Sequence, residues 1–188
     1  MRTRQCRTLL ARSLERRRTE EKVSSATDLN TLTRYKAWAS ERLYQSLDGI
    51  SDADLAADRN TRLGSILATL NHLYAMDLVW QAHLQGRAHG FSTRRPTLFS
   101  ELPDLHSAQT AIDQWYIGYA TELEPDQESA EIDFEFIDGG HGTISRSEVV
   151  LHVVNHATYH RGHITDAMLE IPMRPPVTDL PVFLRDQS

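Results

Sequence analysis

Residues 151–164 read LHVVNHATYHRGHI, and apolar side chains recur through this stretch with the period of an α-helix. On a helical wheel, the apolar residues of this stretch and its flanks share one arc about 100° wide. These residues are Val149, Val153, Ala157, Ile164, Ala167, Met168 and Ile171. His160 falls inside the arc, and His156 lies on its border. His163 and His152 lie progressively further out, so we expect the buried face of this helix to carry one or two histidines.

Four segments of the chain show this three–four spacing of apolar residues, and the helices that they predict span residues 28–47, 63–85, 103–123 and 147–171. Ser145 or Ser147 can cap the start of the fourth helix, and Pro172 must end it. Each helix has one apolar stripe, which is stable only when the other helices cover it. The sequence therefore predicts an all-α fold, a four-helix bundle.

A short β-hairpin is predicted between the third and fourth helices. Apolar and charged side chains alternate through IDFEF at residues 132–136, which is typical of a half-buried strand. The sequence DGG at residues 138–140 favours a tight turn, and residues 143–145 can form the return strand. After the fourth helix, the tail PPVTDLPVFL at residues 175–184 is expected to be extended and to pack back onto the bundle.

The charge of the chain is unevenly distributed. The 188 residues suit one domain, and their net charge of −6 argues against nucleic acid as a main partner. Residues 1–25, however, hold eight Lys and Arg residues against three Glu residues. We interpret them as a basic, poorly ordered N-terminal extension outside a domain that spans residues 26–188. The alternative is a basic arm that touches RNA or another acidic surface.

Cysteine use and hydropathy indicate where the protein resides. Cys6 is the only cysteine, so an internal disulfide and a cysteine-based metal site are both excluded, as expected for a cytoplasmic protein. The basic N-terminal segment lacks the apolar core of a secretory signal. No stretch approaches the roughly 20 apolar residues of a membrane span, and we expect no membrane partner.

His156 and His160 stand four residues apart, so they occupy consecutive turns of one helical face. This H-x-x-x-H spacing allows two imidazoles to bind one cation. A lone histidine is more often a hydrogen-bonded core residue or a surface residue than a metal ligand. For the pair His156 and His160, a metal site and a purely structural role both remain open. Ala157 follows His156, so the glutamate of the H-E-x-x-H metalloprotease motif is absent.

A third ligand must come from outside the fourth helix, and His72 is the first candidate because it borders the apolar stripe in the middle of the second helix. The other candidates are His83 near the end of that helix, His89 and His141 in expected loops, and His106 at the start of the third helix. Three neutral histidines leave a coordination position for water or substrate, as in catalytic sites. Imidazole suits zinc, nickel, iron or copper.

Two stretches of the chain resemble the DinB-like proteins, the DinB/YfiT superfamily of metal-binding four-helix bundles. They are GSILATLNHLYAMDLVWQAHLQG at residues 64–86 and LHVVNHATYHRGHI at residues 151–164. The family pattern falls here on His72, Asp77, Trp80, His156, His160, Arg161 and Gly162. YKAWASERLYQSLDGISDADL is similar to the first helix of the family and PVTDLPVFL to its closing segment, so the resemblance covers residues 27–185.

The resemblance implies a metal site on His72, His156 and His160, which would hold Ni²⁺ or Zn²⁺, with Fe²⁺ or Mn²⁺ as alternatives. It also implies a homodimer. Characterised relatives include thiol S-transferases that use low-molecular-weight thiols, and other members have only an association with stress. His163 stands where the family usually has Gln, so it is either a bystander, a support for the ligands or an extra ligand.

The first functional hypothesis is a metal-dependent thiol S-transferase in stress or detoxification, with a small-molecule thiol and an electrophilic substrate as its partners. Tyr116, Tyr119 or Arg161 would orient the substrate. The side chains expected to support the ligands are His163, Asn71, Asn155, Asp77 and Arg161.

Two alternatives remain at the level of sequence. One is a metal-dependent hydrolase with metal-bound water as the nucleophile and Asp77 or Glu148 as the base. The other is a non-enzymatic, metal-stabilised dimeric stress protein. An open cavity beside the histidines would favour an enzyme, whereas closure of the site by His163 would favour a structural role.

Overall fold

The computed structural model describes residues 29–59 and 61–187, and it confirms the four-helix bundle with a hairpin before the last long helix. The long helices are residues 29–46 (the N-terminal helix), α3 (Ile66–Leu84), α4 (Leu102–Glu122) and α5 (Arg146–Met168). The hairpin is β1 (Glu131–Glu135) and β2 (His141–Ser145), and the short helices are α2 (Asp52–Ala56) and α6 (Leu180–Asp186). The basic extension expected at residues 1–25 lies outside the described residues.

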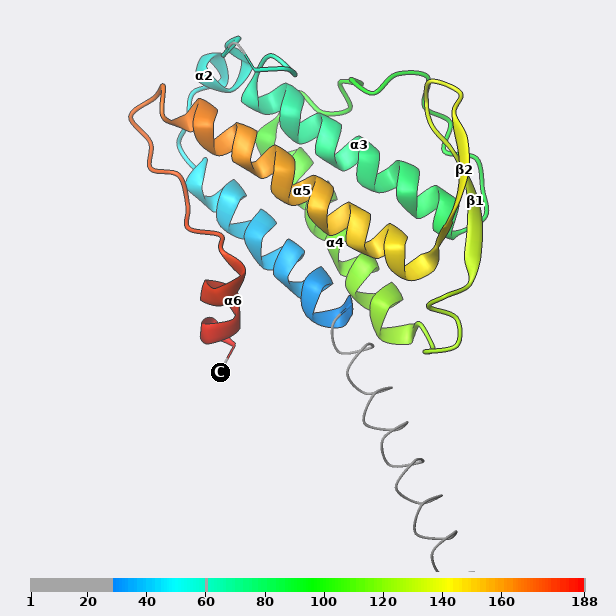
Figure 1. Cartoon of the computed structure of the whole chain (residues 1–188). Coiled ribbons are helices and arrows are strands. Elements are labelled where there is room, and N and C mark those ends of the chain that lie inside the picture. Colours follow the sequence, from blue (N-terminus) through cyan, green and yellow to red (C-terminus); the bar gives the residue numbers. More distant parts are fainter. Residues whose placement is uncertain (1–28, 60, 188) are drawn as a thin grey trace, which may run out of the picture.

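The four long helices pack in a ring in which each helix contacts two others. α3 packs against both α4 and α5. The N-terminal helix closes the ring, because Ala39 shares one apolar cluster with Val154 of α5, and Leu29 shares another with Ala120 of α4. Figure 1 shows α5 between α3 and the N-terminal helix, with α4 behind them. This arrangement places the inner faces of α3 and α5 side by side.

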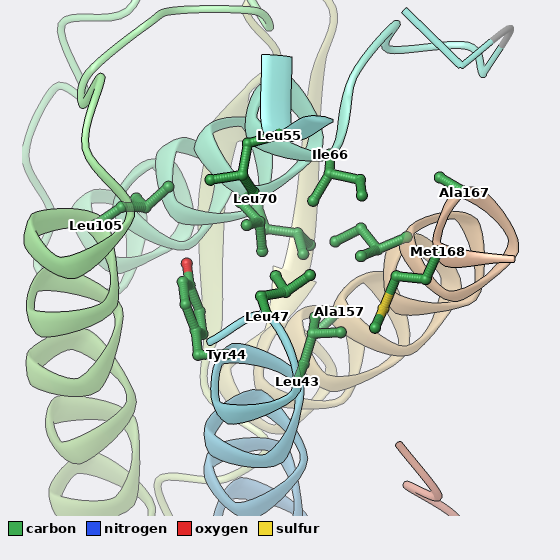
Figure 2. Close-up of a cluster of buried hydrophobic side chains, with 12 residues drawn as sticks. Leu43, Tyr44, Leu47, Leu55, Ile66, Leu70, Leu105, Ala157, Ala167 and Met168 are labelled. Atoms are coloured by element: carbon green, nitrogen blue, oxygen red, sulfur yellow. The ribbon is translucent and has the colours of Figure 1, made fainter. Parts of the chain in front are cut away.

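The largest apolar cluster fills the end of the bundle near α2. Figure 2 shows that all four long helices and α2 contribute to it. Its labelled members are Leu43, Tyr44, Leu47, Leu55, Ile66, Leu70, Leu105, Ala157, Ala167 and Met168. Packing of this kind, and not the helical propensity of any one segment, supplies most of the stability of such helices.

The buried face of α5 is wider than the helical wheel predicts. The apolar residues of the predicted arc are buried, apart from the half-buried Ile171. Val150, Val154 and Arg161 are buried as well, because the N-terminal helix and α3 cover α5 from two sides. Among the described helices, none is both long and apolar enough to cross a membrane.

Ser145 caps α5 as the sequence predicts. Its hydroxyl accepts a hydrogen bond from the backbone N–H of Glu148, and the Glu148 carboxylate accepts one from the backbone N–H of Ser145. This capping box satisfies two backbone donors at the start of the helix. α5 ends at Met168, three residues before the predicted end.

The hairpin packs its apolar side against the open end of the bundle. Its strands pair antiparallel, with Ile132 opposite Ile144 and Phe134 opposite Gly142. Ile132, Phe134 and Ile144 pack against a cluster that includes Trp80. A Cβ atom on Gly142 would lie 2.6 Å from the Phe134 ring, so a larger residue there would displace the ring. The hairpin thereby fixes one wall of the space between α3 and α5.

The prediction of an extended C-terminal tail was wrong in part, because residues Leu180–Asp186 form helix α6. The tail does pack back onto the bundle. Phe183 is buried, and its ring lies 5.9 Å from the Tyr35 ring and 5.6 Å from the Trp38 ring, centroid to centroid. The aromatic side chains of the N-terminal helix thus supply the apolar surface on which this seven-residue helix is stable.

Candidate metal centre

Three histidine side chains meet between α3 and α5. His72 projects from α3, and His156 and His160 project from consecutive turns of α5. Their ring centroids lie 4.5 to 5.2 Å apart, and one ring nitrogen of each lies within 4.8 Å of the other two. The structure therefore brings together the three residues that the sequence analysis singled out, and they could hold one metal ion.

The antiparallel packing of α3 and α5 explains this meeting. The His72 ring contacts the His160 ring, and two turns further along α3 the Trp80 ring lies 4.7 Å from the His152 ring. His72 and His160 are both only 6% exposed, whereas His156 is half-buried. Helical periodicity on each side thus determines which ring faces the partner helix.

A hydrogen bond to the backbone fixes the tautomer of His72. Its Nδ1 lies 2.6 Å from the carbonyl oxygen of Arg94. A carbonyl oxygen only accepts, so Nδ1 carries the proton and Nε2 presents its lone pair. Metal-binding histidines commonly donate their second ring nitrogen to a carbonyl or carboxylate in this way. His72 is therefore prepared to act as a ligand through Nε2.

The triad is held in its neutral form. Burial, followed by repulsion from His160 and His72, lowers the pKa of His156 to about 3. Burial, followed by repulsion from His72 and His163, lowers the pKa of His160 to about 4. Burial also lowers the pKa of His72. Neutral imidazole is the form that binds metals, so no proton competes for these nitrogens near neutral pH.

One buried nitrogen of the triad has no hydrogen-bond partner within the part of the chain that the structure describes. The Nδ1 of His160 is buried and makes no hydrogen bond there. A buried polar atom left unpaired costs about 1–3 kcal/mol. An unpaired nitrogen among three neutral imidazoles fits a divalent metal ion.

A cavity of about 380 Å³ lies beside the triad, and His72, His156 and His160 form part of its lining. Apolar side chains of α3, including Met76 and Val79, and of the hairpin region form much of the rest. A small molecule in this cavity would lie against the ring nitrogens while apolar walls exclude water around it.

Two further histidines of α5 border the triad without joining it. His163 is half-buried, and its ring lies 5.3 Å from the His160 ring and 4.5 Å from the Tyr159 ring. It belongs neither to the group of converging ring nitrogens nor to the cavity lining. His152 does line the cavity and stacks 5.7 Å from the His156 ring. On the helical wheel, His152 lies far from the apolar arc. It is nevertheless half-buried, because Trp80 of α3 lies beside it.

The two asparagines that precede ligands have different surroundings. Asn71 is buried, and its Oδ1 accepts hydrogen bonds from the backbone N–H groups of Leu98 and Phe99. Its Nδ2 donates to the carbonyl of Phe99. Asn155 is exposed. Asn71 therefore fastens the loop between α3 and α4 to α3, and it supports the centre through that loop.

Asp77 belongs to a buried charge network in the middle of the bundle. The Nζ of Lys36 donates to Asp77 at 2.7 Å and also to Asp113, and Gln109 donates to both carboxylates. Burial alone would lower the pKa of Lys36, but the two carboxylates outweigh burial and raise it. Burial raises the pKa of Asp77. This network joins the N-terminal helix, α3 and α4, and the sequence analysis did not find it.

The remaining candidates for substrate contact have their polar groups engaged elsewhere. Arg161 is buried and donates to the Tyr35 hydroxyl at 2.9 Å, so it ties α5 to the N-terminal helix. Tyr116 donates to the Asp77 carbonyl, and the Tyr119 hydroxyl accepts from Arg146. The Glu148 carboxylate accepts within the cap of α5. These side chains hold the bundle together.

The other histidines also lie outside the triad. The Nε2 of His83 lies 3.1 Å from the carbonyl oxygen of Glu135, which joins α3 to the hairpin. His106 pairs with Glu41 at 2.8 Å. His89 lies in the loop after α3, as expected, whereas His141 begins strand β2 and was wrongly predicted to lie in a loop.

Three arginines line the cavity, and the sequence analysis missed them. Arg62 lies just before α3, and Arg94 and Arg95 lie in the loop between α3 and α4. The signal available in the sequence was the Arg-Arg pair in STRRP at residues 92–96, but nothing in that pattern indicates which helix the loop covers.

Comparisons with known proteins agree with this architecture. A family model described as "DinB family" matches residues 23–187. "Protein DinB" of Bacillus subtilis (strain 168) is 24% identical over 159 residues, which cover 81% of this chain and 91% of that protein. The crystal structure of a DinB-like protein from Bacillus cereus ATCC 10987 superposes with a TM-score of 0.58 at 16% identity, covering 74% of this chain and 89% of that one.

Proposed function

Because this chain belongs to the DinB family, we propose that His72, His156 and His160 hold a divalent metal ion and that the protein is a metal-dependent thiol S-transferase. The observation that carries the proposal is the position of the three neutral histidines on the wall of a cavity large enough for a small molecule. Ni²⁺ or Zn²⁺ is the proposed ion, with Fe²⁺ or Mn²⁺ as alternatives. A homodimer in solution is proposed on the family resemblance alone.

When bound, the ion would favour the thiolate over the thiol and so supply the nucleophile. The residues of the chain prepare the site for it. The Arg94 carbonyl holds His72 in the tautomer with a free Nε2, and burial keeps His156 and His160 unprotonated. The lining of the cavity leaves room for the thiol and for an electrophile beside it.

The proposed reaction is a substitution at an electrophilic carbon. The thiol proton passes to solvent, and a bond forms between sulfur and carbon. The bond between that carbon and its leaving group breaks, and the leaving group keeps the electron pair. Apolar walls such as Met76 and Val79 favour this attack over hydrolysis, because they limit the water that can reach the carbon.

The hydrolase alternative has weaker support, because the two carboxylates considered as bases are engaged. Asp77 accepts hydrogen bonds from Lys36 and Gln109, and Glu148 accepts them from Ser145. A purely structural role also has weaker support. His163 does not line the cavity, so it does not close the space beside the triad.

Metal analysis of untagged protein, followed by a thiol titration of Co²⁺-substituted protein, tests the proposal. Glutathione and other low-molecular-weight thiols should shift the visible spectrum of the ion, because sulfur ligation changes its ligand field. The same thiols should then react with a chromogenic aryl chloride faster with wild type than with His160→Ala. If metal is bound but no thiol changes its spectrum, the transferase proposal fails.

A further inference from the structure

Part of the cavity wall is cationic. Arg62, Arg94 and Arg95 reach it from two separate loops, and Glu135 is the only acidic residue among the described residues that line it. The whole chain, by contrast, has a net charge of −6. Positive charge is therefore concentrated in the cavity wall, although the chain as a whole is negatively charged.

Two of these arginines have no acidic partner within the ranges that the structure describes. The Arg95 guanidinium donates to the backbone carbonyl of Arg62 at 2.7 Å, which leaves its charge uncompensated. The guanidinium of Arg62 makes no ion pair with any described carboxylate. Arg94 pairs with Asp138 at 2.9 Å, and both side chains are largely exposed. Guanidinium groups in such a position bind the anionic group of a ligand well, often through two hydrogen bonds.

The arginines lie close to the triad. The backbone carbonyl of Arg94 accepts the hydrogen bond from His72, so the loop is attached at a candidate ligand. Arg62, Arg94 and Arg95 line the same cavity as His72 and His160.

Another part of the cavity wall is apolar. Two turns along α3 from His72, the lining includes Val79 and Trp80, and the hairpin region contributes Phe136 and Ile137. The cationic and apolar parts meet at Arg94, whose guanidinium lies 5.8 Å from the centroid of the Phe136 ring. A ligand with one anionic group and one apolar part would match such a wall.

We propose that Arg62, Arg94 and Arg95 bind a carboxylate of the small molecule that enters the cavity, so that the protein selects an anionic reactant. This inference deepens the proposed transferase function and rests on it for the identity of the reactants. The carboxylate belongs either to the thiol or to the electrophile. Its planar pair of oxygens matches the fork of a guanidinium, which a neutral amide does not.

The first test compares two thiols that differ only in charge, N-acetylcysteine and its amide, as ligands of Co²⁺-loaded protein. Wild type should bind the acid at least about tenfold more tightly than the amide, the factor expected for one charge-assisted contact. Arg62→Gln and Arg95→Gln should each reduce this preference severalfold, and Arg95→Lys should restore part of it. Arg34→Gln removes an exposed arginine of the N-terminal helix and should leave the preference unchanged. Comparing the two thiols within each variant cancels their difference in thiol acidity.

A second arm identifies the reactant that carries the carboxylate. Turnover of a carboxylated aryl chloride is compared with that of its uncharged parent, with one neutral thiol. If Arg62→Gln loses a preference for the charged aryl chloride, the carboxylate belongs to the electrophile. If it loses instead the preference for N-acetylcysteine over its amide, the carboxylate belongs to the thiol. Either result supports the inference. If neither pair shows a preference that depends on the arginines, the inference is overturned.

A third small molecule distinguishes a failure of this inference from a failure of the proposed function. S-methyl-N-acetylcysteine keeps the carboxylate but has no thiol, and its binding to the metal-loaded chain can be followed by calorimetry. Binding that weakens in Arg62→Gln and Arg95→Gln supports the carboxylate site even if no thiol shifts the metal spectrum. Conversely, thiol-induced spectral shifts that are equal for acid and amide already in wild type, together with no preference of wild type for the carboxylated aryl chloride, support the transferase and overturn the carboxylate site.

Discussion

The Nδ1 of His72 donates a hydrogen bond to the backbone carbonyl of Arg94, 2.6 Å away, and so joins a candidate metal ligand to the loop that carries Arg94 and Arg95. The preceding residue, Asn71, holds the same loop at Leu98 and Phe99. Adjacent residues of α3 therefore fasten one loop at two places. The orientation of the ligand and the position of the arginines depend on each other through this loop.

Asn71→Ala should destabilise the protein by about 2–3 kcal/mol, because backbone N–H groups of the loop lose a buried acceptor. It should also weaken metal binding, since the loop orients His72. Denaturant unfolding and metal titration measure the two effects. Asn155→Ala is the matched control, and its stability should change by less than about 0.5 kcal/mol because Asn155 is exposed. Equal effects of the two substitutions would contradict this role for Asn71.

His163→Ala should retain the metal, because the His163 ring contacts His160 and Tyr159 but does not join the converging nitrogens. Metal content after exhaustive dialysis, measured beside wild type and His160→Ala, checks this expectation. A variant that loses the ion as completely as His160→Ala would show that His163 is a ligand.

The metal-free protein should lose stability as the pH falls below about 6.5, the ordinary pKa of histidine in the unfolded chain. Burial and the neighbouring histidines lower the pKa of folded His156 to about 3. Between these values the unfolded state binds a proton that the folded state does not. Stability therefore rises with pH through this window and levels off above it, by up to about 1.4 kcal/mol per pH unit from this residue.

His156→Asn provides the control for this pH dependence, because asparagine is polar but does not titrate. Denaturant unfolding of metal-free wild type and variant at several pH values between about 4 and 8 gives the two slopes. The variant should have the shallower slope. Identical slopes would mean that His156 is not held neutral in the folded protein.

Lys36→Met should destabilise the protein by about 3–5 kcal/mol, because it leaves Asp77 and Asp113 buried without their shared cation. Denaturant unfolding measures the loss. Arg34→Met, on the exposed side of the same helix, should change stability by less than about 0.5 kcal/mol.

A compensating variant distinguishes the loss of the charge network from the loss of packing. Lys36→Met combined with Asp77→Asn and Asp113→Asn removes both buried charges and should recover part of the stability. If the triple variant is no more stable than Lys36→Met, repulsion between the unpaired carboxylates is not the cause of the destabilisation.

The helices and the pairing of the histidines could be predicted because both follow from helical periodicity. Val149, Val153 and Met168 are buried as the wheel requires, and His160 lies among them. His72 could be ranked first because it borders the apolar stripe in the middle of its own helix. Local pattern and global packing agree at these positions, as they must in a stable bundle.

The rest depends on contacts between segments distant in the sequence. Lys36, Asp77 and Asp113 are charged residues that resemble exposed positions until three helices bring them together in the core. His152 faces outward on the wheel of α5, yet Trp80 of α3 lies against it. Arg62 and Arg95 reach the cavity on loops, whose course periodicity does not predict. These groups could be identified only from the tertiary structure.

The central claim is that His72, His156 and His160 form a metal site, and the metal content of untagged protein tests it most directly. Wild type purified without a His tag should carry a stoichiometric divalent ion, measured by plasma mass spectrometry. His160→Ala should lose that ion while keeping the helical circular-dichroism spectrum of the bundle. Wild type without stoichiometric metal, or a His160→Ala variant that carries as much as wild type, would contradict the account.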